Sequence, residues 1–235
     1  MTIKAIITGA SSGVGEFLAK RLAVNGNMLY LTGRSEEKLL KIQKYVISQG
    51  ASCFFKTGDI ASTELANEIV QDALYEMSTI NLLVANAGMG RFKNIEDITD
   101  DDFDLSFSTN VRGVFVYLRP IIRHMKQNNH GQVIVTSSSL GFNTTARGSI
   151  YCATKYALQG MVGSIRKELV KSQVKIATIN PGGIDTPWFV DYGDDPITHR
   201  LDVQEVVDSI MLIINQGERS DIDHILLKPT FERPN

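Results

Sequence analysis

The chain has 235 residues, a formal net charge of −2 and two cysteines, Cys53 and Cys152. We expect one domain over residues 1–235, because this length can bury a full core without disulfides or metal. The near-neutral charge excludes the basic excess typical of nucleic-acid binding, and the apolar run 210–214 is far shorter than the roughly 20 residues of a membrane span. We therefore expect a cytoplasmic protein with reduced thiols, and neither nucleic acid nor membrane among its partners.

Short β-branched runs alternate with longer amphipathic runs, as is typical of a parallel sheet covered by helices on both faces. We predict seven strands, over 3–8, 28–32, 52–56, 81–85, 132–137, 174–179 and 222–228. Between them we predict helices over 13–25, 36–49, 63–77, 102–127, 150–171 and 203–216. The expected fold is α/β: a three-layer, doubly wound (Rossmann) fold whose seven-stranded parallel sheet is flanked by helices. Its ligand would bind beyond the carboxyl ends of the strands.

The turn after the first strand is rich in glycine and leads directly into a helix. It reads Thr8-Gly9-Ala10-Ser11-Ser12-Gly13-Val14-Gly15. Glycines let a backbone approach a pyrophosphate closely, and the start of a helix offers N–H groups to it. The spacing differs from the standard Gly-x-Gly-x-x-Gly fingerprint, and a simple strand-to-helix turn is the alternative. Its place at the first strand–helix junction favours a dinucleotide site.

The end of the second strand bears on which dinucleotide is bound. Many NAD sites have an acidic side chain here to bind the 2′-hydroxyl of the ribose, but this chain has Gly33 at that place, followed by Arg34. A guanidinium can bind a 2′-phosphate through two hydrogen bonds. The alternative is an exposed arginine at a helix start. We predict that NADP(H) is preferred and that NAD(H) remains possible.

A tyrosine and a lysine, Tyr151 and Lys155, lie four residues apart on one face of a predicted helix. A free tyrosine titrates near pH ~10, and a neighbouring cation should lower its pKa and make it a useful proton donor and acceptor. Ser138, at the end of the fifth predicted strand, could hydrogen-bond a substrate oxygen. A Tyr-x-x-x-Lys pair alone is common on helix surfaces, so it becomes specific only in this combination.

With these motifs in this order, essentially the whole chain resembles the short-chain dehydrogenase/reductase family. Thr8–Gly15 matches its glycine motif, and Asn86-Ala87-Gly88 matches the segment after its fourth strand. The resemblance implies that Asn110, Ser138, Tyr151 and Lys155 are catalytic, with Asn110 holding a water of the proton relay. It implies cofactor contacts at Gly9, Ser11, Ser12, Gly13, Val14, Gly15, Arg34, Asp59, Ile60, Asn86, Ala87, Gly88, Tyr151, Lys155, Pro181, Gly182, Ile184 and Thr186.

The activity that the resemblance implies is transfer of a hydride between the nicotinamide of NADP(H) and a small carbonyl or alcohol, with Tyr151 as general acid and base. The alternative on the same fold is a catalytically idle dinucleotide sensor or scaffold. No metal is expected, since the four histidines show no ligand spacing. A homodimer or homotetramer is expected.

The substrate region is the least specific part of the sequence. Residues 183–202 show no clear periodicity and are predicted to form a lid over the site, in which Trp188 and Phe189 offer apolar surface. Arg147 could orient a substrate carboxylate, although a solvated loop arginine is the favoured interpretation. Ser12 stands where many NADP-dependent relatives have a basic residue, so the cofactor preference depends on Arg34.

Overall fold

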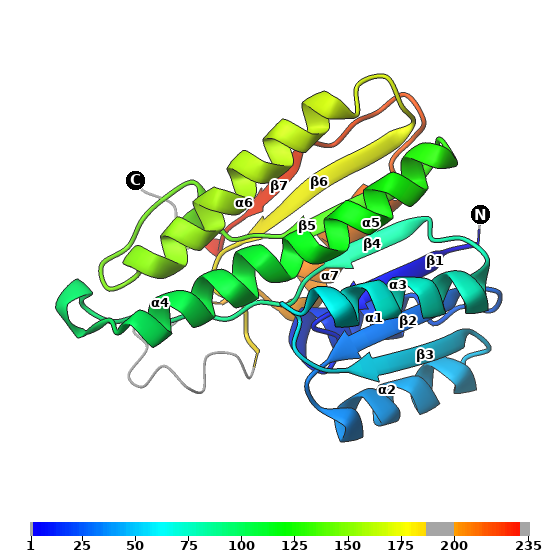
Figure 1. Cartoon of the computed structure of the whole chain (residues 1–235), viewed down its shortest axis with the longest axis horizontal. Coiled ribbons are helices and arrows are strands. Elements are labelled where there is room, and N and C mark those ends of the chain that lie inside the picture. Colours follow the sequence, from blue (N-terminus) through cyan, green and yellow to red (C-terminus); the bar gives the residue numbers. More distant parts are fainter. Residues whose placement is uncertain (1, 187–199, 231–235) are drawn as a thin grey trace.

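The computed structural model describes residues 2–186 and 200–230, and its centre is a parallel sheet in the order β3-β2-β1-β4-β5-β6-β7 (Figure 1). The predicted α/β doubly wound fold is confirmed. The strands are β1 (Lys4–Thr8), β2 (Met28–Gly33), β3 (Ser52–Thr57), β4 (Leu82–Ala85), β5 (Gly131–Thr136), β6 (Val174–Pro181) and β7 (His224–Leu227). The α-helices are α1 (Gly13–Arg21), α2 (Glu36–Ser48), α3 (Thr63–Met77), α4 (Asp100–Phe107), α5 (Gly113–Gln127), α6 (Ser149–Glu168) and α7 (Val203–Ile214).

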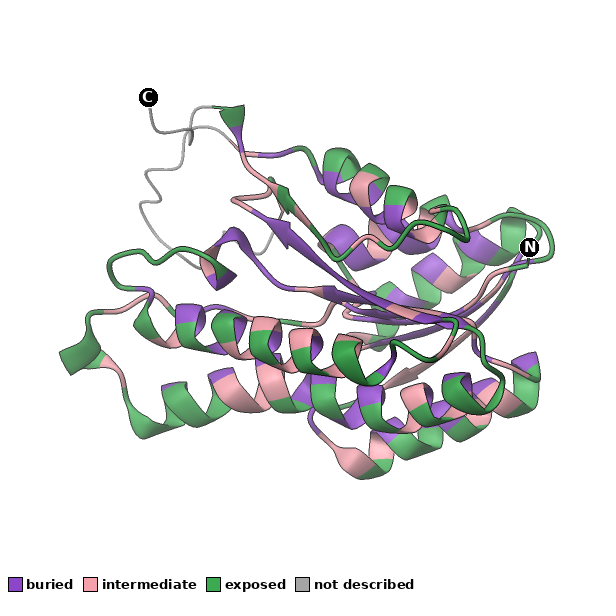
Figure 2. Cartoon of the chain, turned by 90° about the horizontal axis from the view of Figure 1, so that it is seen from above, coloured by how far each residue is buried: buried purple, intermediate pink, exposed green. Residues whose placement is uncertain are grey.

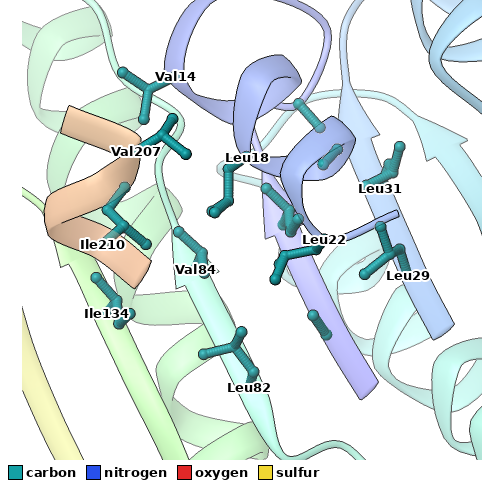
Figure 3. Close-up of a cluster of buried hydrophobic side chains, with 14 of the residues drawn as sticks. Val14, Leu18, Leu22, Leu29, Leu31, Leu82, Val84, Ile134, Val207 and Ile210 are labelled. Carbon is teal, nitrogen blue, oxygen red and sulfur yellow. The ribbon is translucent and has the colours of Figure 1, made fainter. Parts of the chain in front are cut away.

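Both faces of the sheet are buried under helices, because successive side chains of a strand point to opposite faces. On β4, Leu82 and Val84 join the apolar cluster beneath α1, α2 and α7, whereas Leu83 and Ala85 join the cluster beneath α3, α5 and α6. Figure 3 shows the first cluster, in which Leu18 of α1 and Ile210 of α7 lie over the strands. In Figure 2 the buried strands run between helices whose outer faces are exposed.

The strand order reverses between β1 and β4, and doubly wound sheets have their ligand crevice beyond the carboxyl ends of the two strands at such a reversal. From β1 the chain proceeds outward through β2 and β3, and it then crosses back so that β4 pairs with β1 on the other side. The connections from these two strands diverge to opposite faces of the sheet, and ligands of doubly wound sheets bind at this reversal.

The predicted helix 102–127 is the main correction to the expected elements. It begins earlier, at Asp100, and it is interrupted by a π-helical turn, η2 (Ser108–Arg112), between α4 and α5. The start is set by a capping box, in which the Thr99 side chain accepts from the Asp102 N–H and the Asp102 carboxylate accepts from the Thr99 N–H. Single π-helical turns inside helices are frequent at functional sites, and this one contains Asn110.

Other boundaries differ by a few residues. The helix predicted over 13–25 ends at Arg21, and the strand predicted over 174–179 continues to Pro181. The fifth strand ends at Thr136, so Ser138 lies just beyond it and caps the short 3-10 helix η3 (Ser139–Gly141). Among residues 2–186 and 200–230, no helix combines the length and the apolar character that crossing a membrane requires.

Candidate functional site

The crevice is built on hydrogen bonds that join the ends of three strands. The Thr8 hydroxyl, at the end of β1, accepts from the backbone N–H groups of Asn86 and Ala87, each at 3.0 Å. The Asn86 amide donates to the backbone oxygens of Thr8 and Gly9, and its Oδ1 accepts from the Thr136 hydroxyl at 3.1 Å. Asn86, predicted to contact a cofactor, thus uses its side chain to hold β1, β4 and β5 in register.

Close backbone contacts require glycine in the turn after β1. A Cβ on Gly9 would lie 2.7 Å from Cα of Ala87, and Gly9 has φ +65°, a region that side-chain-bearing residues rarely adopt. A Cβ on Gly15 would meet the Gly9 carbonyl oxygen and would lie 2.9 Å from Cα of Ala10. The first turn of α1 is therefore packed closely against the strand ends.

The start of α1 also fits a dinucleotide. Ser12 is the N-cap residue and has extended backbone, but its side chain makes no capping hydrogen bond, and the first N–H groups of a helix have no partner within it. Across the crevice, Cγ2 of Thr186 lies 3.5 Å from the position of a Cβ on Gly13. The predicted phosphate turn and the predicted nicotinamide segment therefore face each other, as one extended cofactor requires.

The end of β2 lies beside this turn. A Cβ on Gly33 would be 2.9 Å from the Ser11 hydroxyl and 3.1 Å from its Cβ, so a side chain here would require Ser11 to shift. The next residue, Arg34, is exposed and forms no ion pair with any described residue. Its guanidinium is thus available to an anion at the mouth of the crevice.

The segment after β3, predicted to contact the adenine, is fixed by local bonds. Asp59 is exposed, and its carboxylate accepts from the Ala61 N–H at 3.0 Å. The Ala61 carbonyl accepts from Arg112 Nε at 3.0 Å. Arg112 is the last residue of the π-helical turn, so the expected adenine end of the crevice is tied to the segment that carries Asn110.

Ser138 lies at the end of β5 with its hydroxyl oxygen held in place. The oxygen accepts a hydrogen bond from the Leu140 N–H at 3.1 Å, and the O–H group donates one to the Pro181 carbonyl at 3.4 Å. The second bond is long for two oxygens. The Ser138 hydroxyl can therefore turn its proton toward a substrate oxygen without moving its own oxygen atom.

Tyr151 and Lys155 lie on α6 beside Ser138, and both are buried. The Lys155 ammonium donates to the Thr136 carbonyl at 3.2 Å and lies 5.5 Å from the centre of the Tyr151 ring. Burial lowers the pKa of Lys155 to about 8, because the charged form loses its hydration. The Tyr151 ring also contacts Phe92, with ring centres 5.2 Å apart.

Asn110 lies at the centre of the π-helical turn, and its side chain joins three elements. Its Oδ1 accepts from the Met89 N–H and its Nδ2 donates to the Met89 carbonyl, both at 2.8 Å. Nδ2 also donates to the Thr154 hydroxyl at 3.0 Å, and that hydroxyl donates to the Tyr151 carbonyl at 2.7 Å. Asn110, the predicted relay residue, therefore also holds α6 in place through its hydrogen bond to Thr154.

Met89 and Thr154 were not predicted as site residues. Thr154 lies directly before Lys155 and is fully buried, and a buried hydroxyl requires a hydrogen-bond partner. A threonine next to the predicted catalytic lysine was therefore a usable signal. Met89 contacts Asn110 through its backbone N–H and carbonyl, so its side chain gave no signal in the sequence.

The segment after β6 crosses the site opposite Ser138. The Gly182 N–H donates to the Leu227 carbonyl at 2.7 Å, and Ile184 forms a bridge with Leu201. Most of the predicted lid over 183–202, with Trp188 and Phe189, lies outside the described residues. Arg147, the residue weighed for a substrate carboxylate, has φ +63° and donates to the Phe92 carbonyl at 3.4 Å.

Comparison with known proteins gives consistent matches over this chain. The family model described as short chain dehydrogenase matches residues 4–196. An uncharacterized oxidoreductase of Staphylococcus aureus is 28% identical over 225 residues, which cover 96% of each chain. The structure of an alcohol dehydrogenase from the archaeon Thermococcus sibiricus, complexed with 5-hydroxy-NADP, is 27% identical with a TM-score of 0.91 and covers 100% of this chain and 99% of that chain. A metagenomic short-chain oxidoreductase in complex with NADP is 26% identical with a TM-score of 0.84, over 96% of each chain.

A substitution in the glycine turn after β1 tests whether its close backbone contacts are needed for cofactor binding. Gly9→Ala should weaken NADPH binding by tenfold or more, because its Cβ would push against the Ala87 backbone. Gly26→Ala is the matched control, since Gly26 also has positive φ, at +88°, but has no atom within 4 Å of an added Cβ. It should lose about 1 kcal/mol of stability and keep its affinity. Fluorescence titration with NADPH measures the affinity of each variant. Equal affinities of Gly9→Ala and Gly26→Ala would contradict the steric argument.

The lowered pKa of Lys155, about 8, predicts how stability depends on pH. Between this value and the ordinary pKa of an unfolded lysine, near 10.4, the unfolded chain binds more protons than the folded one, so stability rises with pH. The free energy of unfolding is measured with urea for the wild type and for Lys155→Met. Above pH 8 the wild type should gain stability relative to the variant, by roughly tenfold in the folding equilibrium constant per pH unit. A pH-independent difference would show that Lys155 titrates normally.

Proposed function

This chain belongs to the short-chain dehydrogenase family, and we propose that it is an NADP(H)-preferring oxidoreductase that transfers a hydride between the nicotinamide and a small carbonyl or alcohol. The observation that carries the proposal is the convergence of Ser138 and of Tyr151 with Lys155 at the end of β5, beside the glycine turn. The Thermococcus and metagenomic structures, which hold 5-hydroxy-NADP and NADP, support the cofactor. We further propose that residues 1–235 form one cytoplasmic domain.

The residues around the crevice suit the parts of a dinucleotide. The turn Gly9–Gly15 and the start of α1 would hold the pyrophosphate, and Asp59 and Ile60 the adenine. Lys155 would hold the nicotinamide ribose, and the segment 181–186 the nicotinamide. When bound, the reduced cofactor supplies the hydride, and the protein supplies binding, orientation and proton transfer.

The proton chemistry belongs to Ser138 and Tyr151. During reduction both hydroxyls would donate hydrogen bonds to the substrate oxygen and stabilise the negative charge that develops there. Tyr151 would then give its proton to the alkoxide oxygen, and in the reverse direction it would accept the alcohol proton. Phe92, packed on the Tyr151 ring, keeps the ring in position and adds apolar surface where a small hydrophobic carbonyl compound would lie.

Lys155 has two roles in this proposal. Its cation, buried beside the phenol, favours the phenolate form of Tyr151 and so eases proton release. Its ammonium has three N–H groups, of which one donates to the Thr136 carbonyl, and the ribose hydroxyls would accept from the others. Asn110 would hold the water that resupplies the proton, while its side chain fixes Thr154 and hence α6.

The idle sensor or scaffold remains the second candidate on the same fold. A pure binder needs the glycine turn and the Lys155 contact to the ribose, but it has no use for a serine hydroxyl that can redirect its proton beside a buried tyrosine. The Ser138 geometry therefore favours the enzyme.

Tyr151→Phe removes the proton donor and keeps the ring. We expect the turnover of aldehydes and ketones with NADPH to fall by roughly a hundredfold to ten-thousandfold, since general acid–base catalysis contributes on the order of 10²–10⁴. NADPH affinity should stay within about twofold. Tyr156→Phe is the control, because Tyr156 is exposed on the same helix. Unchanged turnover of Tyr151→Phe would leave the idle binder as the better description.

Arg34→Ala tests the cofactor preference. Loss of a charge-assisted contact to the 2′-phosphate should raise the KM for NADPH roughly tenfold to a hundredfold and leave the KM for NADH nearly unchanged. Arg119→Ala is a control that removes an exposed arginine from α5. If the wild type uses NADPH and NADH equally well, the preference that we assign to Arg34 is wrong.

The described surface supports the proposed homo-oligomer. Phe103, Leu105 and Phe115 on α4 and α5 are 44–47% exposed, and an interface between copies of the chain would remove such apolar surface from water. Light scattering should give more than one chain per particle, and Phe115→Glu should lower that mass. Tyr75→Glu, at an 86% exposed position on α3, should not. A monomeric wild type would contradict the proposal.

A further inference from the structure

Three polar side chains between α6 and β6 close a ring of hydrogen bonds beside the site: Gln159, Thr178 and Asn180. Gln159 Nε2 donates to Asn180 Oδ1, Asn180 Nδ2 donates to the Thr178 hydroxyl at 2.9 Å, and that hydroxyl donates to Gln159 Oε1 at 3.3 Å. Within the ring each side chain donates one hydrogen bond and accepts one. The ring can therefore close only with groups that both donate and accept, as two amides and a hydroxyl do. Thr178 and Asn180 are 2% and 0% exposed, which makes the ring a buried one.

The donors left over from the ring reach neighbouring elements. Gln159 Nε2 also donates to the Ser137 hydroxyl at 3.1 Å, and that hydroxyl donates to the Lys155 carbonyl at 3.4 Å. Asn180 Nδ2 also donates to the Ile225 carbonyl on β7 at 3.2 Å. The ring therefore connects α6 with the segment that follows β5 and with the strands β6 and β7.

Three residues of this network, Ser137, Gln159 and Asn180, lie close in the sequence to residues of the proposed site. Ser137 precedes Ser138, Asn180 precedes Pro181, and Gln159 lies one helical turn beyond Lys155 on the same face of α6. Gly141 leaves the room that the amide needs, since a Cβ there would be 2.9 Å from Gln159 Nε2. The network thus contacts the two segments that carry Ser138 and the Tyr151–Lys155 pair, and also the start of the segment proposed to hold the nicotinamide.

We propose that Gln159 is a positioning residue for the reaction, an inference that rests on the proposed function. By closing the ring with Thr178 and Asn180 and holding Ser137, it sets the distance between Ser138 and the Tyr151–Lys155 face of α6. Apolar side chains of similar size would pack at this depth without the desolvation cost of buried amides. What the polar ring adds is a single defined position of α6 against β6, because hydrogen bonds are directional and apolar packing is not.

The first test is Gln159→Met, which keeps the length of the side chain and removes its hydrogen bonds. Activity is measured with NADPH and the carbonyl compound that the wild type reduces fastest. We expect kcat to fall about tenfold or more, since displacements of about 1 Å cost up to a hundredfold in rate. The Kd for NADPH should stay within about twofold. Gln71→Met makes the same change at an exposed position of α3 and should leave kcat unchanged.

A second variant opens the ring elsewhere and covers the case in which Gln159→Met does not fold. Thr178→Val replaces the hydroxyl by a methyl group of similar size, and it should lower kcat in the same direction. Once either substitution has opened the ring, most of the ring's contribution to kcat is already lost. The second substitution therefore has little further effect. The double variant should therefore lose much less than the product of the two single effects.

The outcomes separate the two proposals. If the wild type reduces carbonyl compounds while folded Gln159→Met and Thr178→Val keep kcat within twofold and lose only thermal stability, the ring is merely structural and the inference is overturned. If the two effects multiply fully in the double variant, the ring does not act as a unit, and the inference is also overturned. If the wild type itself turns over no carbonyl or alcohol, the proposed function fails and the inference fails with it.

Discussion

The backbone of Gly9 lies against the backbone of Ala87, where the ends of β1 and β4 meet, and the rest of the site depends on this contact. It is possible only because Gly9 lacks a side chain and because the Thr8 hydroxyl accepts two N–H groups from the neighbouring strand end. From this point the start of α1 is directed into the crevice, and Asn86 carries the same register across to Thr136 on β5. Thr136 in turn accepts from Lys155.

Hydrogen bonds between neighbouring strand ends, beginning at this one junction, therefore fix the positions of the site residues. Buried polar groups are costly unless they are paired, and here the pairing partners are the carbonyls and hydroxyls at the tips of the strands. Lys155 illustrates the cost, since its burial lowers its pKa. The same burial places its charge 5.5 Å from the centre of the Tyr151 ring in the protein interior, where electrostatic effects are stronger than in water.

The doubly wound sheet could be predicted from the alternation of strand-like and helical runs, because both faces of every central strand must be apolar. The structure also brings Ser138 and the Tyr151–Lys155 pair together, as their motif spacing led us to expect. The π-helical turn could not be predicted, since one extra residue in a helix leaves no mark in composition. Gln159 was missed because its partners lie 19 and 21 residues away. Two polar residues inside the buried strand β6, Thr178 and Asn180, were the available signal.

The π-helical turn η2 also determines how α4 and α5 face their surroundings. One residue beyond the α-helical count rotates everything downstream by about 100° about the helix axis. The apolar stripe of α5 is thus out of phase with that of α4, although the two helices follow each other without a loop. Deleting one residue of 108–112 would give a continuous α-helix with better local geometry, but it would turn Asn110 away from Met89 or α5 away from the sheet. Regular α-helical geometry and the geometry of this site therefore make opposite demands on these five positions.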